Sequence, residues 1–455
     1  MDYKKNIVDA IDSKKDFLND LAMKIHDNPE LAYNEVQACA WMVEALKENG
    51  FEVESPVYGM PTAIRATWGS GKPVIGLLAE YDALPGLSQQ NGTTTFTPVV
   101  EGGPGHGCGH NLLGTATLAA ALGMKADLEA NNLPGTVIFY GCPAEEVLTG
   151  KPFMAREGAF KECDLCLAWH GGAANMVHYG IAGGVIGVQF HFKGRTAHAS
   201  GSPWKGRSAL DACEILSVCA NYLREHIPDK ARIHYVYKEA GVAPNIVPDK
   251  ASVWYYVRDL SREGMVDIYE RLCDCARGAA LATGTELEIE YQGGCYNTHA
   301  NETISKVTYE ELCELTPVEW TKEEKNMAMA LASTDPNYDG GDPLPTGVRP
   351  MVWYESSGSF DLGDVQHIVP CGLVSTVTWT TLGNHHWTAT CTSGSSIGLK
   401  GMLQGGKVVA LTAARFFRDP ALVEQAKADF AKVMEGKEYQ CLVTDDMKVP
   451  QPQGK

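Results

Sequence analysis

The sequence has few basic residues and no long apolar stretch. The first feature limits the partners that we expect, and the second argues against a membrane-spanning protein. Lysine and arginine number 38 against 56 aspartates and glutamates, so the formal net charge is −18. Nucleic acid and anionic membrane surfaces both require a basic face, so we expect neither as a partner. No run approaches the roughly 20 apolar residues of a membrane span. The first residues contain no apolar core of signal-peptide length, so we expect no secretion signal.

Cysteine is too sparse for a disulfide framework. The chain has 14 cysteines among 455 residues, well below the density of small disulfide-stabilised secreted domains. Most of them are expected to be reduced, buried, small side chains. We therefore expect a cytoplasmic protein.

The chain is too long for one ordinary hydrophobic core, and its outer parts alternate apolar strands with helical patterns. Strands are expected at 63–68, 74–79, 136–141, 164–169 and 373–379. Such alternation favours an α/β fold with helices on both faces of a largely parallel sheet. Near the N-terminus, Asn34 is expected to cap a helix that ends at Gly50.

The order of elements changes after about residue 184. A strand-helix-strand-strand-helix-strand order begins there, similar to a ferredoxin-like unit, and the outer pattern resumes near residue 300. We therefore expect a three-layer catalytic domain formed by residues 1–183 and 297–455. An inserted α+β domain at 184–296 is expected to interrupt it.

A thiol and an imidazole lie two residues apart in the glycine-rich residues 105–114. If this stretch is extended, Cys108 and His110 point to the same side and can bind one metal ion together. A buried cysteine beside a structural histidine is the ordinary alternative. The glycines favour the metal, because they let the backbone approach a ligand closely. The stretch does not match the dinucleotide-binding fingerprint, since Leu112 or His110 stands where its third glycine belongs.

Further candidate ligands follow three expected strands, at the end where open α/β sheets bind ligands. They are Glu145, Glu146, His170, His385 and His386. Adjacent side chains diverge, so one glutamate can bind metal while the other acts as a general base. An acidic helix start, a structural histidine and a surface pair of histidines are the ordinary alternatives. Asp82, after the strand at 74–79, can orient a metal-bound histidine or cap a turn.

Three polar residues stand out in the inserted segment: His198, Asn245 and Arg258. Arg258 ends an expected strand, and an arginine can hold a substrate carboxylate through two hydrogen bonds. Taken alone, each of the three fits a structural or solvated role as well as a functional one.

Together and in this order, the motifs resemble the dinuclear metallopeptidase and amidohydrolase family. That family includes aminoacylases, hippurate hydrolases, indole-acetyl-amino-acid hydrolases and carboxypeptidases acting on glutamyl amides. The similarity covers nearly the whole chain and is greatest to the branch that contains the B subunits of p-aminobenzoyl-glutamate hydrolases. It rests on AEYDALPGLSQQ (79–90), GHGCGHNLLG (105–114), GCPAEE (141–146), GRTAHA (194–199), NIVPD (245–249), GSFDLGDV (358–365) and HHW (385–387).

The resemblance implies two divalent metal ions, zinc or manganese, held by Cys108, His110, Glu146, His170 and His385. It implies that Glu145 is the general base and that Asp82 supports the site. His198 would polarise the scissile carbonyl from the inserted lid domain, across a dimer interface. Asn245 and Arg258 would bind the substrate's carboxylate. The inserted domain would also make the protein a homodimer.

The sequence departs from the family pattern at three places. Glu80 stands where many relatives have a histidine ligand, and His110 is expected to replace that imidazole. The doubled histidine leaves His386 as an alternative ligand to His385. Phe360 replaces the usual threonine of a Gly-Ser-Thr stretch, so the pocket there is expected to differ.

The function expected from the resemblance is hydrolysis of an amide between an acyl or aryl group and an amino acid, as in p-aminobenzoyl-glutamate. Two alternatives stay open. The chain could be a metal-binding or scaffold subunit that needs a related partner in a hetero-oligomer. Alternatively, Cys108 could be a nucleophile activated by His110. A chelator would silence a metal hydrolase and spare a thiol enzyme.

Overall fold

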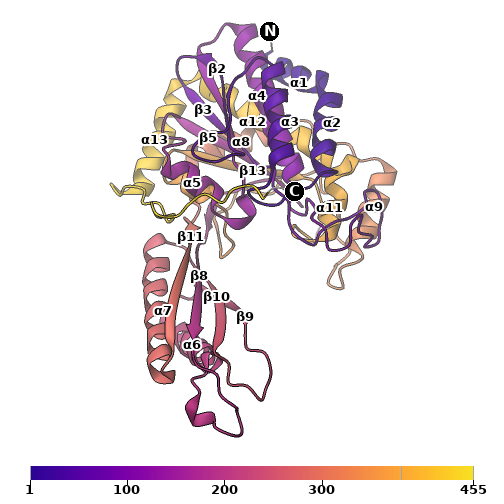
Figure 1. The fold of residues 1–455 in the computed structure, drawn as a ribbon. Coiled ribbons are helices and arrows are strands. Elements are labelled where there is room, and N and C mark those ends of the chain that lie inside the picture. Colours follow the sequence, from indigo (N-terminus) through magenta and orange to yellow (C-terminus); the bar gives the residue numbers. More distant parts are fainter. Residues whose placement is uncertain (1, 381, 454–455) are drawn as a thin grey trace.

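The computed structural model describes residues 2–380 and 382–453. A larger α/β unit carries both ends of the drawn chain, and a slender second unit projects from it (Figure 1). Within the described residues, none of the helices combines the length and the apolar character that crossing a bilayer requires.

The larger unit is built on a seven-stranded sheet in the order β1-β2-β4-β3-β5-β13-β6. These strands are β1 (Glu52–Glu54), β2 (Ile64–Ser70), β4 (Gly135–Gly141), β3 (Val74–Ala79), β5 (Leu165–Gly172), β13 (Cys371–Val377) and β6 (Met176–Val177). The four middle strands run parallel to one another, and antiparallel strands close both edges. The expected largely parallel sheet is confirmed.

Both faces of the middle strands are buried. In β3, Ile75 and Leu77 join one hydrophobic core, while Leu78 joins the core on the opposite face. In β4, Val137 belongs to the first of these cores and Ile138 to the second. Continuous apolar strands of this kind are typical of parallel sheets that helices cover on both sides.

Helices form the outer layers. One face is covered by α1 (Tyr3–Ser13), α2 (Lys15–His26), α3 (Val36–Glu48), α4 (His110–Asn131), α8 (Glu302–Glu314), α12 (Ser396–Arg418) and α13 (Pro420–Met434). The other face is covered by α5 (Gly150–Arg156) and α10 (Leu362–Gln366). The unit also contains α9 (Lys322–Ala332) and α11 (Trp387–Ser393).

The smaller unit is a four-stranded antiparallel sheet in the order β11-β8-β10-β9. Its elements are β8 (Gly184–Lys193), α6 (Ala209–Leu223), β9 (Arg232–Glu239), β10 (Lys250–Asp259), α7 (Arg262–Thr283) and β11 (Glu286–Cys295). Val253 and Tyr255 of β10 face α6 and α7 and belong to a separate core. Their neighbours Trp254 and Tyr256 point to the other face, which we call the open face.

The two units meet where the chain enters and leaves the smaller one. Val185 of β8 pairs with Cys295 of β11, so the segment departs and returns at one place. Beside this junction, β7 (Gly180–Ala182) and β12 (Tyr354–Ser356) form a short parallel pair.

The expected helix cap at Asn34 is wrong. Helix α3 begins at Val36, and Glu35 occupies the cap position. Glu35 is wholly buried, and its carboxylate accepts hydrogen bonds from the backbone N–H groups of Tyr33 and Ala144. A buried carboxylate requires such donors, so this position is set by the interior and not by the helix.

Candidate metal centre

The candidate ligands gather at the carboxyl ends of the parallel strands, beside the smaller unit. Glu80 and Asp82 follow β3, and Glu145 and Glu146 lie in a short 3-10 turn (Glu145–Val147) after β4. His170 lies in β5, His385 follows β13, His110 is the first residue of α4, and Cys108 lies two residues before it. Because parallel strands end at one edge of the sheet, these distant segments meet there.

Three sets of side chains have ligand atoms within 4.8 Å of one another. They are Cys108 with His110 and His170, Cys108 with Glu146 and His385, and Glu80 with His110 and Glu145. Cys108 and His110 each belong to two sets, so the three sets form one continuous cluster. Sulfur, imidazole and carboxylate donors together suit zinc and similar divalent ions.

The thiol of Cys108 lies at the middle of the cluster. Its Sγ is 3.4 Å from His170 Nε2, and Asn384 Nδ2 donates to it at 3.3 Å. Burial alone would raise the pKa of this thiol, but the imidazoles of His170 and His110 outweigh it and lower the pKa well below its usual range. A lowered pKa favours the thiolate, the form that binds metal. Asn384 was not among the expected site residues.

Asp82 orients two members of the cluster. Its Oδ1 accepts a hydrogen bond from His110 Nδ1, and its Oδ2 accepts one from the backbone N–H of Glu146, both at 2.9 Å. The His170 Nδ1 similarly donates to the carbonyl of Gly171 at 2.7 Å. Both histidines thereby direct Nε2 into the cluster, as metal-bound histidines with an oriented ring do.

Buried polar atoms without partners test whether the cluster fits metal. His110 Nε2, Glu80 Oε2 and Glu146 Oε1 are buried and make no hydrogen bond within the described part of the chain. A buried polar group left unpaired costs about 1–3 kcal/mol. Three such atoms at one place fit the coordination of cations, so the residues present suit the expected centre.

The structure separates the two adjacent histidines. His385 Nε2 lies 3.3 Å from Glu146 Oε2 and belongs to the cluster. His386 instead caps α11, where its Nδ1 lies 2.8 Å from Thr388 Oγ1 and accepts from the Thr388 N–H. Of the two expected alternatives, His385 is the one that faces the other ligands.

A buried lysine lies beneath the centre, and no sequence motif had indicated it. Lys151 Nζ is 2.5 Å from both Glu80 Oε1 and Asp361 Oδ1, and all three side chains are shielded from solvent. Burial favours the neutral amine, but Asp361 and Glu80 overcome it and raise the pKa of Lys151 well above its usual value. The ammonium therefore fixes one oxygen of Glu80 and leaves the other facing His110 at 3.4 Å.

A cavity of about 530 Å³ opens over the cluster, between the two units. Its lining includes Cys108, Glu145, Glu146, His170, His385, Tyr256, Arg258, Leu84, Leu148, Phe360, Leu362 and Leu373. Arg258, from β10 of the smaller unit, donates to Ser359 Oγ at 2.6 Å, and its buried Nε has no partner. The cavity therefore combines the ligand cluster with one arginine and an apolar wall.

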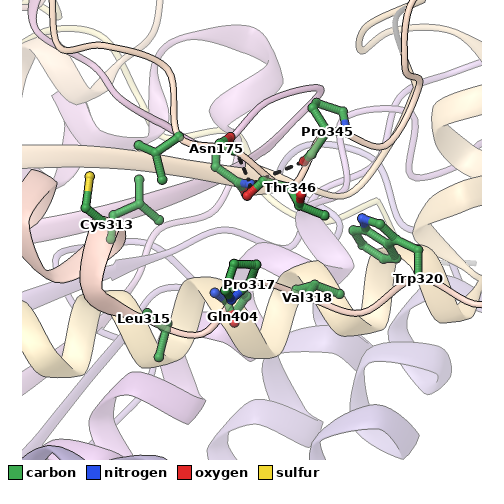
Figure 2. Close-up of a pocket in the computed structure, with 12 residues that line it drawn as sticks. Asn175, Cys313, Leu315, Pro317, Val318, Trp320, Pro345, Thr346 and Gln404 are labelled. Atoms are coloured by element: carbon green, nitrogen blue, oxygen red, sulfur yellow. Dashed lines mark hydrogen bonds between the residues drawn. The ribbon is translucent and has the colours of Figure 1, made fainter.

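A separate cavity of about 300 Å³ is also largely apolar, but neither the ligand cluster nor an arginine lines it (Figure 2). Cys313 is the one ionisable side chain that lines it, beside Trp320 and Val318. The amide of Asn175 is already used, because it donates to the carbonyls of Pro345 and Thr346 at 3.3 Å. Apart from the Cys313 thiol, the lining contains no acid, base or candidate metal ligand.

His198 and Asn245 lie outside the larger cavity. Both are exposed, in loops at the end of the smaller unit that points away from the central sheet (Figure 1). His198 Nδ1 accepts a hydrogen bond from the Gly201 N–H, and the Asn245 carbonyl accepts one from Ala199. Within a single chain these two residues do not reach the ligand cluster.

Comparison with known proteins connects this site to a family. The description of peptidase family M20/M25/M40 matches residues 76–444. The chain is 37% identical to the p-aminobenzoyl-glutamate hydrolase B subunit of Escherichia coli (strain K12), with 98% of each chain covered. It is 31% identical to the Xaa-Arg dipeptidase of Mus musculus, over 94% of this chain and 92% of that one.

Solved structures share the fold. The aminobenzoyl-glutamate utilization protein from Klebsiella pneumoniae superposes with a TM-score of 0.62 at 16% identity, covering 88% of this chain and 96% of that one. A Bacillus subtilis protein described as a dinuclear metal-binding peptidase of the M20 family gives 0.61 at 19% identity, covering 90% and 99%. Both comparisons agree with the resemblance inferred from the motifs.

Proposed function

Since this chain belongs to peptidase family M20/M25/M40, whose members here are hydrolases of amide bonds, we propose that it cleaves an N-acyl or aryl-amide amino acid in a metal-dependent reaction. p-Aminobenzoyl-glutamate, after which the Escherichia coli relative is named, is the type of substrate we expect. One observation carries the proposal. The carboxylate of Glu145 lines the cavity, lies 3.8 Å from His110 Nε2 and belongs to the third set of candidate ligands.

Five side chains would hold two divalent ions: Cys108, His110, Glu146, His170 and His385. The chemistry that bound ions supply is polarisation of the scissile carbonyl and a lowered pKa for a water molecule. Glu145 would serve as the general base for the attacking water and would return a proton to the leaving amine. Asp82 keeps His110 in the tautomer whose Nε2 faces the cluster. The donor set suits zinc, and its carboxylates and imidazoles also accept manganese.

Arg258 would bind the carboxylate of the amino acid. Its guanidinium lines the cavity, and its Nε is buried without a partner. Burial favours the neutral form and lowers the pKa of Arg258, although the group stays charged at physiological pH. A carboxylate would restore the partner that this desolvated cation lacks.

We infer that residues 184–296 form a ferredoxin-like lid that also joins two copies of the chain, with 1–183 and 297–455 as the catalytic domain. The strand order of the smaller sheet and the two helices on one face support this inference. Its exposed apolar side chains include Val218, Tyr222 and Val236 on α6 and the edge strand β9. A second copy would bring His198 to stabilise the oxyanion and Asn245 to bind the substrate.

The decisive test is the substitution Glu145→Gln. It keeps the shape of the side chain and removes the base, so turnover should fall by about 10²- to 10⁴-fold. If Glu145 acts as the base, metal content measured by elemental analysis stays at the wild-type value; if it binds metal with Glu80 and His110, as the third set allows, metal content falls. Near-normal turnover in the metal-loaded variant contradicts the assignment.

A second candidate function follows from the name of the relative, which is one subunit of a hydrolase. The chain would then need a related partner for activity in a hetero-oligomer. Activity of the purified, metal-loaded chain alone excludes this, whereas activity that emerges only with a partner supports it. The thiol alternative is weaker, because Cys108 is shared between two sets of candidate ligands; loss of activity in a chelator, with recovery on adding metal, excludes it.

The location in the cell stays a prediction. All 14 cysteines lie in the described residues and none of them forms a disulfide. Unpaired thiols in this number are typical of a reducing compartment, which supports the cytoplasm.

A further inference from the structure

The turn that carries Glu145 has a backbone conformation that its own residues disfavour. The 3-10 turn Glu145–Val147 lies between Ala144 and Leu148, whose φ angles are 60° and 58°. Residues other than glycine rarely adopt this left-handed region, and they keep it only where the surrounding structure imposes it. The contacts around the turn therefore decide where Glu145 points.

The direction of the Glu145 side chain depends on this backbone. Among residues 2–380 and 382–453, no group donates a hydrogen bond to the Glu145 carboxylate, and His110 Nε2 lies 3.8 Å from it. The side chain is buried and lines the larger cavity. A rotation of the turn would therefore carry the carboxylate out of its place in the cavity.

Glu35 holds the residue that precedes Glu145. Its Oε1 accepts hydrogen bonds from the backbone N–H of Ala144 at 2.8 Å and from that of Tyr33 at 2.9 Å. Its Oε2 accepts one from the Thr62 hydroxyl at 3.1 Å. Glu35 and Thr62 are both buried. The Glu35 carboxyl group thus ties the start of the turn to the loop before α3 and to Thr62.

Two further contacts hold the rest of the turn. Asp82 accepts a hydrogen bond from the Glu146 N–H at 2.9 Å, and the hydroxyl groups of Tyr33 and Thr149 lie 2.6 Å apart. Asp82 also orients His110, so its loss would disturb a proposed metal ligand directly. In the described part of the chain, Glu35 accepts hydrogen bonds from none of the five proposed ligands. Substitutions of Glu35 therefore change the support of the turn and leave the ligand contacts alone.

We propose that Glu35 is a positioning residue for the general base, because its hold on the Ala144 N–H fixes the turn with the Glu145 carboxylate facing the cavity. This inference rests on the proposed function, since it concerns the base assigned there. Glu35 acts through the backbone of the turn and touches no reacting atom. It determines how well the base is placed and leaves the binding of the amino acid to other residues.

The role needs a hydrogen-bond acceptor at Glu35 and no negative charge. Burial raises the pKa of Glu35 to about 8, and the charge of Asp82 contributes to the rise. Glutamine keeps the oxygen that accepts from Ala144 and Tyr33, and it places its amide NH₂ beside Thr62, whose hydroxyl can accept instead. Glutamine is therefore the conservative replacement, and leucine removes the acceptor at a similar size.

The kinetic test compares Glu35→Leu with Glu35→Gln in the metal-loaded protein, with p-aminobenzoyl-glutamate as substrate. In Glu35→Leu, kcat should fall about ten- to hundredfold, because a catalytic group displaced by about 1 Å loses rate on that scale. KM should stay within about twofold, since Arg258 and the apolar wall of the cavity are untouched. Glu35→Gln should keep most of the activity. A loss of the same size in both variants overturns the inference.

Hydrogen exchange provides a readout that does not depend on turnover. Exchange in the peptide that covers 142–149, followed by mass spectrometry, should be faster in Glu35→Leu, because the Ala144 N–H has lost its acceptor. It should be unchanged in Glu35→Gln. If Glu35→Leu does not yield folded protein, Glu35→Asp replaces it. That variant keeps a carboxyl group beside Tyr33 and shortens the reach to Ala144, so the same two changes should appear at a smaller size.

Glu30→Leu is the matched control. Glu30 lies in the same loop, and its Oε2 also accepts from two backbone N–H groups, those of Gln37 at 2.8 Å and Ala38 at 3.0 Å. These two groups begin α3 and do not belong to the turn. Glu30→Leu should therefore speed exchange at the start of α3 and leave both kcat and the exchange of 142–149 unchanged.

The two readouts separate this inference from the proposed function. If the unaltered, metal-loaded chain hydrolyses no amide, the proposed function fails, while faster exchange of 142–149 in Glu35→Leu alone still supports the hold of Glu35 on the turn. If the unaltered chain is active and Glu35→Leu has the same kcat, the inference is overturned and the proposed function stands. An equal loss of kcat in Glu35→Leu and Glu30→Leu assigns Glu35 to the general stability of the loop and also overturns it.

Discussion

The Lys151 ammonium is the residue that holds the floor of the metal centre together. It lies between Glu80 and Asp361, and all three side chains are buried. Glu80 follows β3, Lys151 belongs to α5, and Asp361 precedes α10, so one cation links three segments distant in sequence. The contact fixes Glu80 beneath His110.

Replacing Lys151 with methionine should therefore destabilise the fold. Lys151→Met leaves two buried carboxylates without a countercharge and should lower the free energy of unfolding by about 3–5 kcal/mol. The double variant Lys151→Met with Asp361→Asn removes one of those charges and should lose clearly less. Urea denaturation of the three proteins measures the difference. Equal stability of the single variant and the parent would mean that the ion pairs contribute nothing.

Asp364 gives the fold a dependence on pH. Burial raises the pKa of Asp364 to about 7, although the Tyr439 hydroxyl and the Tyr296 N–H both donate to its carboxylate. In an unfolded chain the pKa of an aspartate is about 3.9. Between these two values the folded protein binds more protons than the unfolded chain. The free energy of unfolding should therefore fall as pH rises from about 4 to about 7, and the contribution of Asp364 should level off above that.

The substitution Asp364→Asn should flatten this dependence, because it removes the titrating group and keeps the shape. The measurement is the free energy of unfolding in urea at a series of pH values, for both proteins. The slope between about pH 4 and pH 7 should be shallower in the variant. Parallel curves would show that the carboxyl group titrates normally.

At the scale of whole elements, two glycines in helices have opposite roles. A Cβ at Gly405 of α12 would lie 2.1 Å from Trp169 Nε1, because the helix packs directly on β5. A Cβ at Gly278 of α7 would meet nothing within 4 Å. The same change from glycine to alanine should therefore act in opposite directions at the two positions.

Gly405→Ala should lower the free energy of unfolding by about 1–3 kcal/mol, since it forces Trp169 away from its packed position. Gly278→Ala should raise it by about 0.5–1 kcal/mol, because alanine favours a solvent-facing helix position. Urea denaturation of the two variants side by side provides the check. A loss of stability at Gly278 would contradict the open surroundings of that helix.

The helices and strands that could be predicted are those whose own residues show a full run of hydrophobic periodicity with recognisable ends. Strand β3 was expected at 74–79 and is found there, because its apolar run is bounded by turn and acidic residues. Strands β6, β7 and β12 have two or three residues each and no periodicity, so only pairing with distant segments forms them. Their positions could not be read from the sequence.

The candidate site also has a part that could be predicted from the sequence and a part that could not. The ligand motifs were predictable, because each follows a recognisable strand and the ends of parallel strands converge. The partners that hold them were not, because burial of Glu35 or Lys151 depends on donors and charges far away in the chain. The positions of His198 and Asn245 outside the cavity were also not derivable from spacing. Their roles, like those of the other site residues, stay predictions.

For the molecule as a whole, the placement of His198 predicts complementation between copies. If a second chain supplies His198, dimers of Glu145→Gln and dimers of His198→Ala are both inactive. A mixed dimer contains one cavity in which both residues are intact. Co-production of the two variants should therefore restore a substantial part of the activity, measured after purification of the mixed species by two different affinity tags. Mixed dimers as inactive as the parents would exclude a shared site.

The junction at Val185 and Cys295 has a consequence for how such proteins diversify. The chain enters and leaves the smaller unit at one place, and that unit has its own core. One continuous stretch of the gene, coding for residues 184–296, thus encodes the side of the cavity that carries Arg258. The two flanking stretches encode Glu145 and the candidate metal ligands. A recombination event or a designed graft that replaces this single segment would exchange the residues proposed to bind the amino acid, and His198 with them, while Glu145 and the five proposed metal ligands stay in place.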